Sequence, residues 1–282
     1  MVSFKALLVL FSGAAVVLGE RVGRGCGTTI TEEKLAAAQA HFEAHRKEPL
    51  LAKAAPVTVH WNIIYRDTTV NGGYVPDSSI EAQMQVLNDD YAGSGISFAL
   101  GDVQRIQNAV WFSRLGPYDT VAMENEMKRL YRKGGASTLN VYTVGFEVGQ
   151  TADLLGYATF PADYSLNPTD DGIVMHHASV PGGTFSPYNL GRTLTHEVGH
   201  WVGLYHTFQG ACAGVGDQVA DTPPEARPAF GCPVGRDTCP GGGADPIHNY
   251  MDYSDDSCMD HFTPGQITRL KAQVATYRQI VD

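Results

Sequence analysis

The sequence predicts an α/β or α+β fold in which strands and helices alternate through most of the chain and a smaller, irregular part follows. Short runs rich in β-branched and aromatic residues are typical of strands, and longer polar runs carry apolar residues at helical spacing. The part after residue 206 is instead crowded with glycine, proline and acidic residues. At 282 residues, 43 % of them hydrophobic, the chain can bury a sizeable core.

Each regular element follows from its local pattern. VTVHWNIIY at 57–65 is strand-like. In the run 78–92, Ile80, Met84 and Leu87 fall on one face of a helix. The same two patterns predict further strands at 96–106, 138–146, 156–161 and 172–180, and helices at 124–135 and 264–281. The proline that ends the run 156–161 is suited to the edge of a sheet.

The first 53 residues predict two segments that are removed on maturation. Residues 1–19 combine one lysine, an apolar run and small residues, which is typical of a secretory signal. A membrane anchor is the alternative, but the run is short and charged residues follow at once. Residues 20–53 hold a polar helix capped by Thr31 and are interpreted as a pro-segment, with an ordinary N-terminal helix as the alternative.

The motif HEVGHWVGLYH predicts a metal site. His196 and His200 are four residues apart, so they share one face of a helix and can bind one ion. Gly203 lets the chain leave the helix, and His206 returns as a third ligand. Three imidazoles leave the fourth position of Zn²⁺ open for water, beside which Glu197 is suited to act as general base. The alternative is a coincidental pair of histidines on a helix surface.

Charge limits the partners. The formal net charge of −10 argues against nucleic acid and anionic membranes, because both need a basic surface. Nine acidic residues lie between Gly214 and Asp260, against two arginines. This run forms a solvated face, an acidic pocket for basic substrates or a Ca²⁺ site. The candidate calcium ligands are Asp217, Asp221 and Thr222.

The five cysteines divide into four and one. In a secreted protein, an even cluster implies two disulfides, and three pairings are open. The clustered residues are Cys212, Cys232, Cys239 and Cys258. Cys26 is left over and lies far away, in the predicted pro-segment.

The zinc motif followed by NYMDY at 249–253 is similar to the signature of metzincin metalloproteases, in which a methionine turn lies beneath the zinc. NYMDYSDD followed by Cys258 resembles the pappalysin family, particularly its secreted fungal members. The resemblance extends from about Pro56 onward. It implies a metzincin-like α/β (α+β) fold with a mixed twisted sheet and the zinc helix at the cleft. It also implies a catalytic domain at 54–282, with an upper subdomain at 54–203 and a smaller, loop-rich lower subdomain at 204–282.

The resemblance further implies roles for single residues. Met251 would form the methionine turn, and Tyr253 would hydrogen-bond the developing oxyanion, with a purely structural tyrosine as the alternative. Asp256 would select Arg or Lys in the pocket after the scissile bond. Cys26 would block the zinc until the pro-segment is cut away, with an intermolecular disulfide as the alternative. The implied disulfides are Cys212–Cys239 and Cys232–Cys258.

These observations predict a secreted, extracellular zinc endopeptidase made as a latent zymogen, with Zn²⁺ as cofactor and Ca²⁺ as a candidate second ion. We expect a monomer that acts on proteins or peptides and has no nucleic-acid or stable membrane partner. The substrate would lie antiparallel to an edge strand, for which GYATFP at 156–161 is the candidate. The other classes are a zinc-stabilised binding protein, disfavoured by the intact Glu197, and an amidase or deacetylase, disfavoured by the implied extended cleft.

Overall fold

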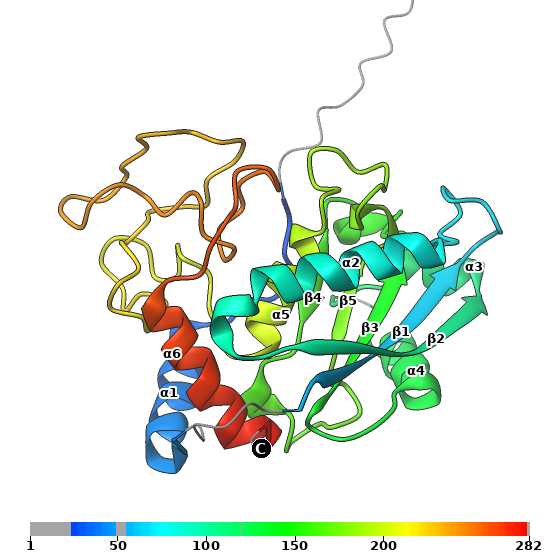
Figure 1. The fold of residues 1–282 in the computed structure, drawn as a ribbon, viewed down its shortest axis with the longest axis horizontal. Coiled ribbons are helices and arrows are strands. Elements are labelled where there is room, and N and C mark those ends of the chain that lie inside the picture. The colour runs from blue at the N-terminus through cyan, green and yellow to red at the C-terminus, as the bar shows by residue number, and fades with distance from the viewer. Residues whose placement is uncertain (1–23, 49–54, 119, 281–282) are drawn as a thin grey trace, which may run out of the picture.

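A computed structural model describes residues 24–48, 55–118 and 120–280; the predicted signal at 1–19 lies outside this range. The chain forms one five-stranded sheet in the order β2-β1-β3-β5-β4, in which β4 alone is antiparallel and lies at an edge (Figure 1). The strands are β1 Val57–Tyr65, β2 Phe98–Gln107, β3 Thr138–Val144, β4 Gly156–Ala158 and β5 Ile173–His176. The α-helices are α1 Glu32–His45, α2 Asp77–Asp90, α3 Ala109–Arg114, α4 Val121–Tyr131, α5 Arg192–Trp201 and α6 Pro264–Gln273. The predicted mixed α/β fold is confirmed.

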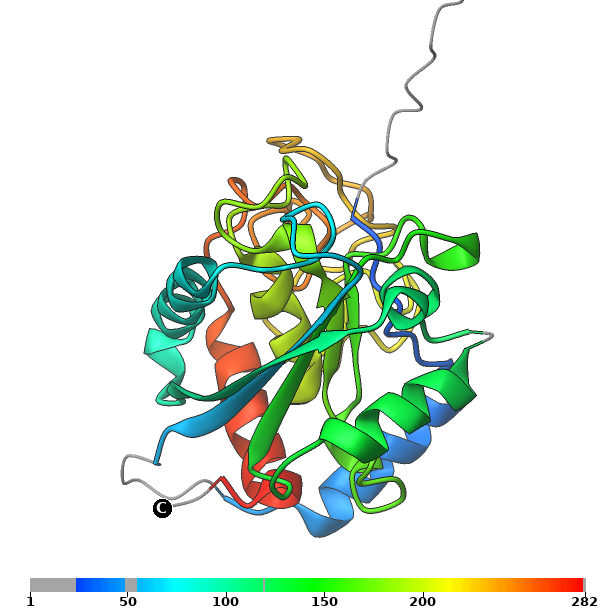
Figure 2. The same cartoon turned by 90° about the vertical axis from the view of Figure 1, so that its right-hand side faces the viewer.

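The sheet has a separate core on each face because successive side chains of a strand point to opposite sides. Trp61 and Val141 pack with α2 and α5 on one face. Tyr142 and Val144 pack with α3 and α4 on the other. Figure 2 shows α2 and α4 on opposite sides of the sheet. Burial on both faces explains why consecutive residues are buried in the inner strands β3 and β5 and in much of β1.

Several predicted boundaries were wrong, and one helix was not predicted. The strand predicted at 172–180 ends at His176, whose side chain accepts a hydrogen bond from the Ala178 amide and starts a 3-10 turn. The last helix changes from α to π geometry after Gln273. The helix predicted at 124–135 is shifted to α4. Helix α3 was not predicted, because its six residues are too few to show periodicity, although Asn108 caps it.

The stretch between α5 and α6 consists of turns and bends, and it gathers at one end of the molecule in Figure 1. Helix α6 begins with a capping box of Thr263 and Gln266, and the Asp221 carboxylate accepts a further hydrogen bond from the Gly265 amide. Loops of this length need contacts of other kinds to stay ordered, because they lack a regular backbone ladder.

Helix α1 lies beside α6 (Figure 1). The side chains of Leu35 and Phe42 are buried, and Arg269 of α6 contacts the ring of Phe42 and the side chain of Gln39. Thr31 caps the helix as predicted. In the described part of the chain, no helix has the length and apolar character needed to cross a bilayer.

Candidate metal centre and cleft

Helix α5 carries two histidines that meet a third beyond its end. His196 and His200 are fully buried and lie one turn apart. The chain then turns at Gly203, whose φ of +99° is a conformation that favours glycine. This turn returns His206, whose Nε2 lies 3.2 Å from that of His196 and 3.1 Å from that of His200. The structure therefore brings together the three histidines predicted from the spacing.

The rings are oriented by their other nitrogens. Nδ1 of His196 lies 2.7 Å from the Tyr250 carbonyl oxygen, and Nδ1 of His200 lies 2.9 Å from that of Leu204. Because a carbonyl only accepts, both Nδ1 atoms donate, and each Nε2 keeps a free lone pair. Burial lowers the pKa of His200 to about 4 and holds those of His196 and His206 well below their ordinary value. Neutral imidazoles with converging lone pairs fit Zn²⁺.

A methionine turn lies against the same helix. Met251 is fully buried, and a Cβ atom at Gly199 would lie 2.3 Å from its sulfur. The Asn249 side chain accepts a hydrogen bond from the Met251 amide and forms a double amide pair with Gln266. The position between the two helical histidines must therefore be glycine for the turn to pack this closely. The sequence motif contains Gly199, but its contact is visible only in the fold.

Glu197 and Tyr253 border the histidine centre. Burial raises the pKa of Glu197 to about 8, and its Cγ packs where a Cβ of Gly156 would lie. The ring of Tyr253 lies 5.1 Å from that of His206 and 5.8 Å from that of His196. Burial raises the pKa of Tyr253 well above its usual value, so its hydroxyl stays protonated and can donate.

Residues 24–28 pack against β4 and the histidine centre, where the cleft is expected. The Cys26 sulfur lies within 4.8 Å of the nitrogens of all three histidines and 3.5 Å from Oε2 of Glu197. The surrounding backbone pairs with β4 in parallel: the Leu155 amide donates to the Gly25 carbonyl and the Gly27 amide to that of Gly156. The predicted contact between Cys26 and the metal centre is thus geometrically available.

Asp256 binds the side chain of Arg24, at the N-terminal end of this segment. The Arg24 guanidinium donates to its Oδ1, and both side chains are almost completely buried. The Leu190 amide donates to Oδ2 over 2.8 Å, and the Arg24 guanidinium also lies over the ring of Tyr188, 5.1 Å from its centroid. Arg24 was missed in the sequence, although it lies two residues before Cys26, the spacing at which an extended chain points side chains to one side.

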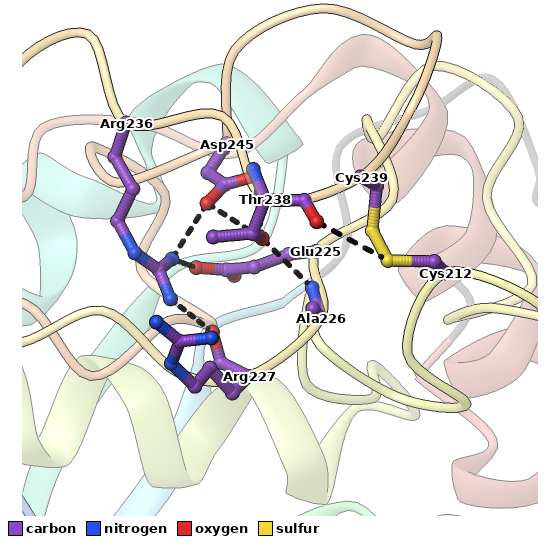
Figure 3. Close-up of a disulfide and its surroundings, with 8 residues drawn as sticks. All are labelled: Cys212, Glu225, Ala226, Arg227, Arg236, Thr238, Cys239 and Asp245. Carbon is purple, nitrogen blue, oxygen red and sulfur yellow. Dashed lines mark hydrogen bonds and ion pairs between the residues drawn. A yellow bond between two sulfur atoms is a disulfide. The ribbon is translucent and has the colours of Figure 1, made fainter.

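Much of the acidic run is buried. Of its nine members, Asp217, Glu225, Asp245, Asp252 and Asp256 are at most 5 % exposed, so a solvated face does not describe them. Figure 3 shows Arg236 between the carboxylates of Glu225 and Asp245, with Thr238 donating to Asp245. Burial and the nearby Asp252 raise the pKa of Glu225 to about 8. Buried polar and charged side chains thus order these loops where apolar side chains are scarce.

Two disulfides join the same loops: Cys212–Cys239 and Cys232–Cys258. This is the pairing that the family resemblance implies. His248 lies near the second bridge, but both sulfurs there are already bonded to each other.

The three candidate calcium ligands have different surroundings. Asp221 is engaged at the start of α6, where its carboxylate accepts from Thr263 and Gly265. Buried oxygens of Asp217 and Thr222 have no hydrogen-bond partner in the described structure. Among the described residues, two groups of three or more His, Cys, Asp or Glu side chains lie close enough to bind a metal ion, and neither includes these positions. Calcium stays a prediction.

The fold and the histidine centre define the class of protein, a zinc metalloendopeptidase of the metzincin type. A model of the Peptidase M43 family, described as pregnancy-associated plasma protein-A, matches residues 137–275. Extracellular metalloprotease 1 of Coccidioides posadasii is 42 % identical over 289 residues, which cover 98 % of each chain. An extracellular metalloprotease of Podospora anserina is 44 % identical over 91 % of each chain. The chain belongs to the pappalysin family, as its sequence motifs predict.

Solved structures agree with this assignment. A glutamate-to-alanine mutant of Tannerella forsythia promirolysin has a TM-score of 0.74 and 26 % identity, covering 91 % of this chain and 96 % of the other. Mature mirolysin with a cleaved peptide has a TM-score of 0.67 and 29 % identity, covering 82 % and 96 %.

Proposed function

We propose that this chain is a secreted zinc endopeptidase made as a latent precursor, with Glu197 as general base and a preference for Arg or Lys after the scissile bond. The residues that would hold the ion are His196, His200 and His206. When bound, Zn²⁺ supplies a Lewis acid that polarises the scissile carbonyl and lowers the pKa of a coordinated water. The observation that carries the proposal is the segment 24–28, which fills the cleft with a thiol at the histidines and a guanidinium at Asp256.

Glu197 is the group that would move the proton. Its Oε2 is 3.5 Å from the Cys26 sulfur, so the carboxylate borders the position that the thiol fills. Glu197 would take a proton from the attacking water and deliver it to the leaving nitrogen. The Tyr253 hydroxyl is 3.4 Å from the Cys26 carbonyl oxygen, which supports a role in donating to the oxyanion.

The direction of the segment in the cleft supports latency. Residues 24–28 run parallel to β4, whereas we expect a substrate to pair with this edge in the antiparallel direction. A reversed backbone exchanges the positions of amide and carbonyl groups, so the segment fills the cleft without presenting a bond in the orientation for attack. A Cys26 thiolate would also exclude water from the ion.

The pair of Arg24 and Asp256 supports the substrate preference. Relative to the histidines, Arg24 lies on the side of the cleft that an antiparallel substrate fills after its scissile bond. A buried carboxylate with a bound guanidinium is a suitable pocket for Arg or Lys. We propose that Arg24 imitates that residue of the substrate.

Processing and secretion belong to the same proposal. The relatives are named extracellular metalloproteases, which supports a signal at residues 1–19. The pro-segment would be 20–53, leaving a mature domain of 54–282 with subdomains at 54–203 and 204–282. Ca²⁺ and a monomeric state stay predictions.

The test uses the secreted full-length chain, matured in the medium and mixed with a whole-proteome peptide library, with and without a zinc chelator. Mass spectrometry would identify every cleavage site. We expect chelator-sensitive cuts before Arg or Lys, and loss of about 10³-fold or more of the activity in Glu197→Ala with zinc content unchanged. Wild-type turnover in Glu197→Ala would contradict the role of Glu197 as general base. Stoichiometric zinc with no cleavage would support the binding-protein interpretation instead.

Latency is tested separately with Cys26→Ser. We expect the unprocessed Cys26→Ser chain to cleave a reporter peptide, whereas the unprocessed wild type does not. If both unprocessed chains bind zinc and neither cleaves the reporter, the thiol is not what holds the precursor inactive. If both cleave it, the N-terminal segment does not block the cleft.

A further inference from the structure

A second cavity, separate from the histidine centre, opens at the carboxyl ends of β1, β3 and β5. Its volume is about 580 Å³, and it is bordered by the segments that follow these strands. Residues that line it include Asn71, Glu147, Asp153 and His177. In open α/β sheets, the carboxyl ends of neighbouring parallel strands are where ligands usually bind. Nothing in the histidine chemistry uses this cavity.

The floor of the cavity holds a buried histidine with an unused nitrogen. His177 is 7 % exposed, and its Nδ1 has no hydrogen-bond partner among the described residues. Burial lowers the pKa of His177 to about 4, so the ring is neutral near neutral pH. His177 therefore contributes a neutral ring to the lining of the cavity.

The rim of the cavity holds one carboxylate that is neutralised and one that is not. Glu147 pairs with Arg66 over 2.5 Å and accepts from the Ser113 hydroxyl. Asp153 is exposed, and no ion pair or hydrogen bond of its side chain occurs within the described structure. The rim therefore offers a free negative charge beside a neutral ring.

The cavity adjoins the cleft at Asp153. The carbonyl oxygen of this residue lies 2.3 Å from the point where a Cβ of Gly25 would be, so the N-terminal segment passes directly against it. Leu155, Phe185 and Tyr188 pack together between the cavity and the Arg24 side chain. Since the segment is parallel to β4, this border is the side that follows the scissile bond in an antiparallel substrate.

We propose that this cavity is an additional specificity subsite, which takes a Lys or Arg side chain from the second or third residue after the scissile bond. The cation would pair with Asp153, while its alkyl stem contacts Phe185 and the ring of His177. An acidic side chain would be repelled by the uncompensated charge of Asp153, and an apolar one would leave that charge without a partner. The inference rests on the proposed endopeptidase function and names further residues that select its substrate.

The experiment compares peptides that carry Arg directly after the scissile bond and either Lys or norleucine at the second or third position after it. The full-length chain is first freed of its N-terminal segment by limited trypsin treatment. For the matured wild type we expect kcat/KM to be about fivefold to tenfold higher with Lys at one of these positions. In Asp153→Asn the Lys peptide should fall to the norleucine value, while the norleucine peptide is cleaved as before. Glu126→Gln, which removes an exposed charge from α4, is the matched control.

Binding separates this inference from the endopeptidase proposal. Fluorescence anisotropy with Glu197→Ala, with and without Asp153→Asn, measures the affinity of the same peptides without turnover. Tighter binding of the Lys peptide that Asp153→Asn abolishes would support the subsite even if no variant cleaved. Equal affinities and equal rates for Lys and norleucine would overturn it, and so would a Lys preference that survives Asp153→Asn.

Discussion

The sheet with its helices and the loops between α5 and α6 bury different kinds of side chain. Around the sheet, the core consists of aliphatic and aromatic residues contributed by strands and by α2, α3, α4 and α5. In the loops, the comparable apolar cluster contains Ala229, Ile247 and Cys258. Order there comes largely from two disulfides and from buried carboxylates paired with Arg236 and backbone amides.

The two regions contribute different groups to the cleft. The helix α5 contributes Glu197 and two of the three histidines from a rigid apolar support, which suits groups that must keep fixed geometry. The loops contribute Tyr253 and Asp256, whose positions depend on covalent and charged contacts. We therefore expect the loop region to respond to reduction and pH, and the sheet region to respond to lost packing and to breakage of its few buried charges.

The largest effect is expected from Arg278→Ala, which tests a charged contact of the sheet region. Arg278 is fully buried, pairs with Asp171 over 2.9 Å and donates to the Trp201 carbonyl. Its removal leaves a buried carboxylate with weaker compensation, so the free energy of unfolding should fall by about 3–5 kcal/mol in urea denaturation. Arg129→Ala, at an exposed site on α4, is the control. A loss no larger than that of the control would show that this charge is dispensable.

Removal of the bridge in Cys212→Ser/Cys239→Ser should cost about 3 kcal/mol, since the bridge closes a loop with a sequence separation of 27. We expect hydrogen exchange to accelerate in the loops while the amides of β1 and β3 stay protected. If the amides of the sheet lose protection equally, the two regions unfold as one unit and the comparison fails.

Gly199→Ala tests the contact between the two regions. The added methyl group would lie 2.3 Å from the buried sulfur of Met251, so the turn or the helix must shift. We expect a loss of about 1–3 kcal/mol and weaker zinc binding, measured by denaturation and chelator competition. Gly135→Ala, where no atom lies within 4 Å of the added Cβ, is the control. Unchanged zinc affinity in Gly199→Ala would mean that the turn does not position the histidines.

The last test concerns the dependence of stability on pH. The pKa of Glu225 is raised from 4.5 to about 8, so the folded chain holds a proton over this range that the unfolded chain has released. Its contribution to stability is therefore lost as the pH rises from about 5 to 8. The Tm of the wild type should fall over this interval more than that of Glu225→Gln. Identical pH profiles for the two chains would contradict a titrating Glu225.

Local patterns predicted most of the regular elements. The run of β-branched and aromatic residues in β1 and the helical spacing of Ile80, Met84 and Leu87 in α2 are properties of neighbouring residues, and both elements form as expected. The short helix α3 was not predicted, because it has too few residues to display a period. The burial of the acidic run was not predicted either, since these carboxylates are bound by a cation or an amide that the fold brings from elsewhere.

By itself, the sequence determined the three converging histidines, because one helical turn and one glycine turn set their geometry within eleven residues. It also determined the family, through the zinc motif and the methionine turn. Only the tertiary structure decided that Arg24 meets Asp256 across 232 residues of chain. It also decided that Met251 packs against Gly199 and that Asp153 and His177 border one cavity. Such contacts join residues with no local relation, so they depend on how the sheet and the disulfide-linked loops pack together.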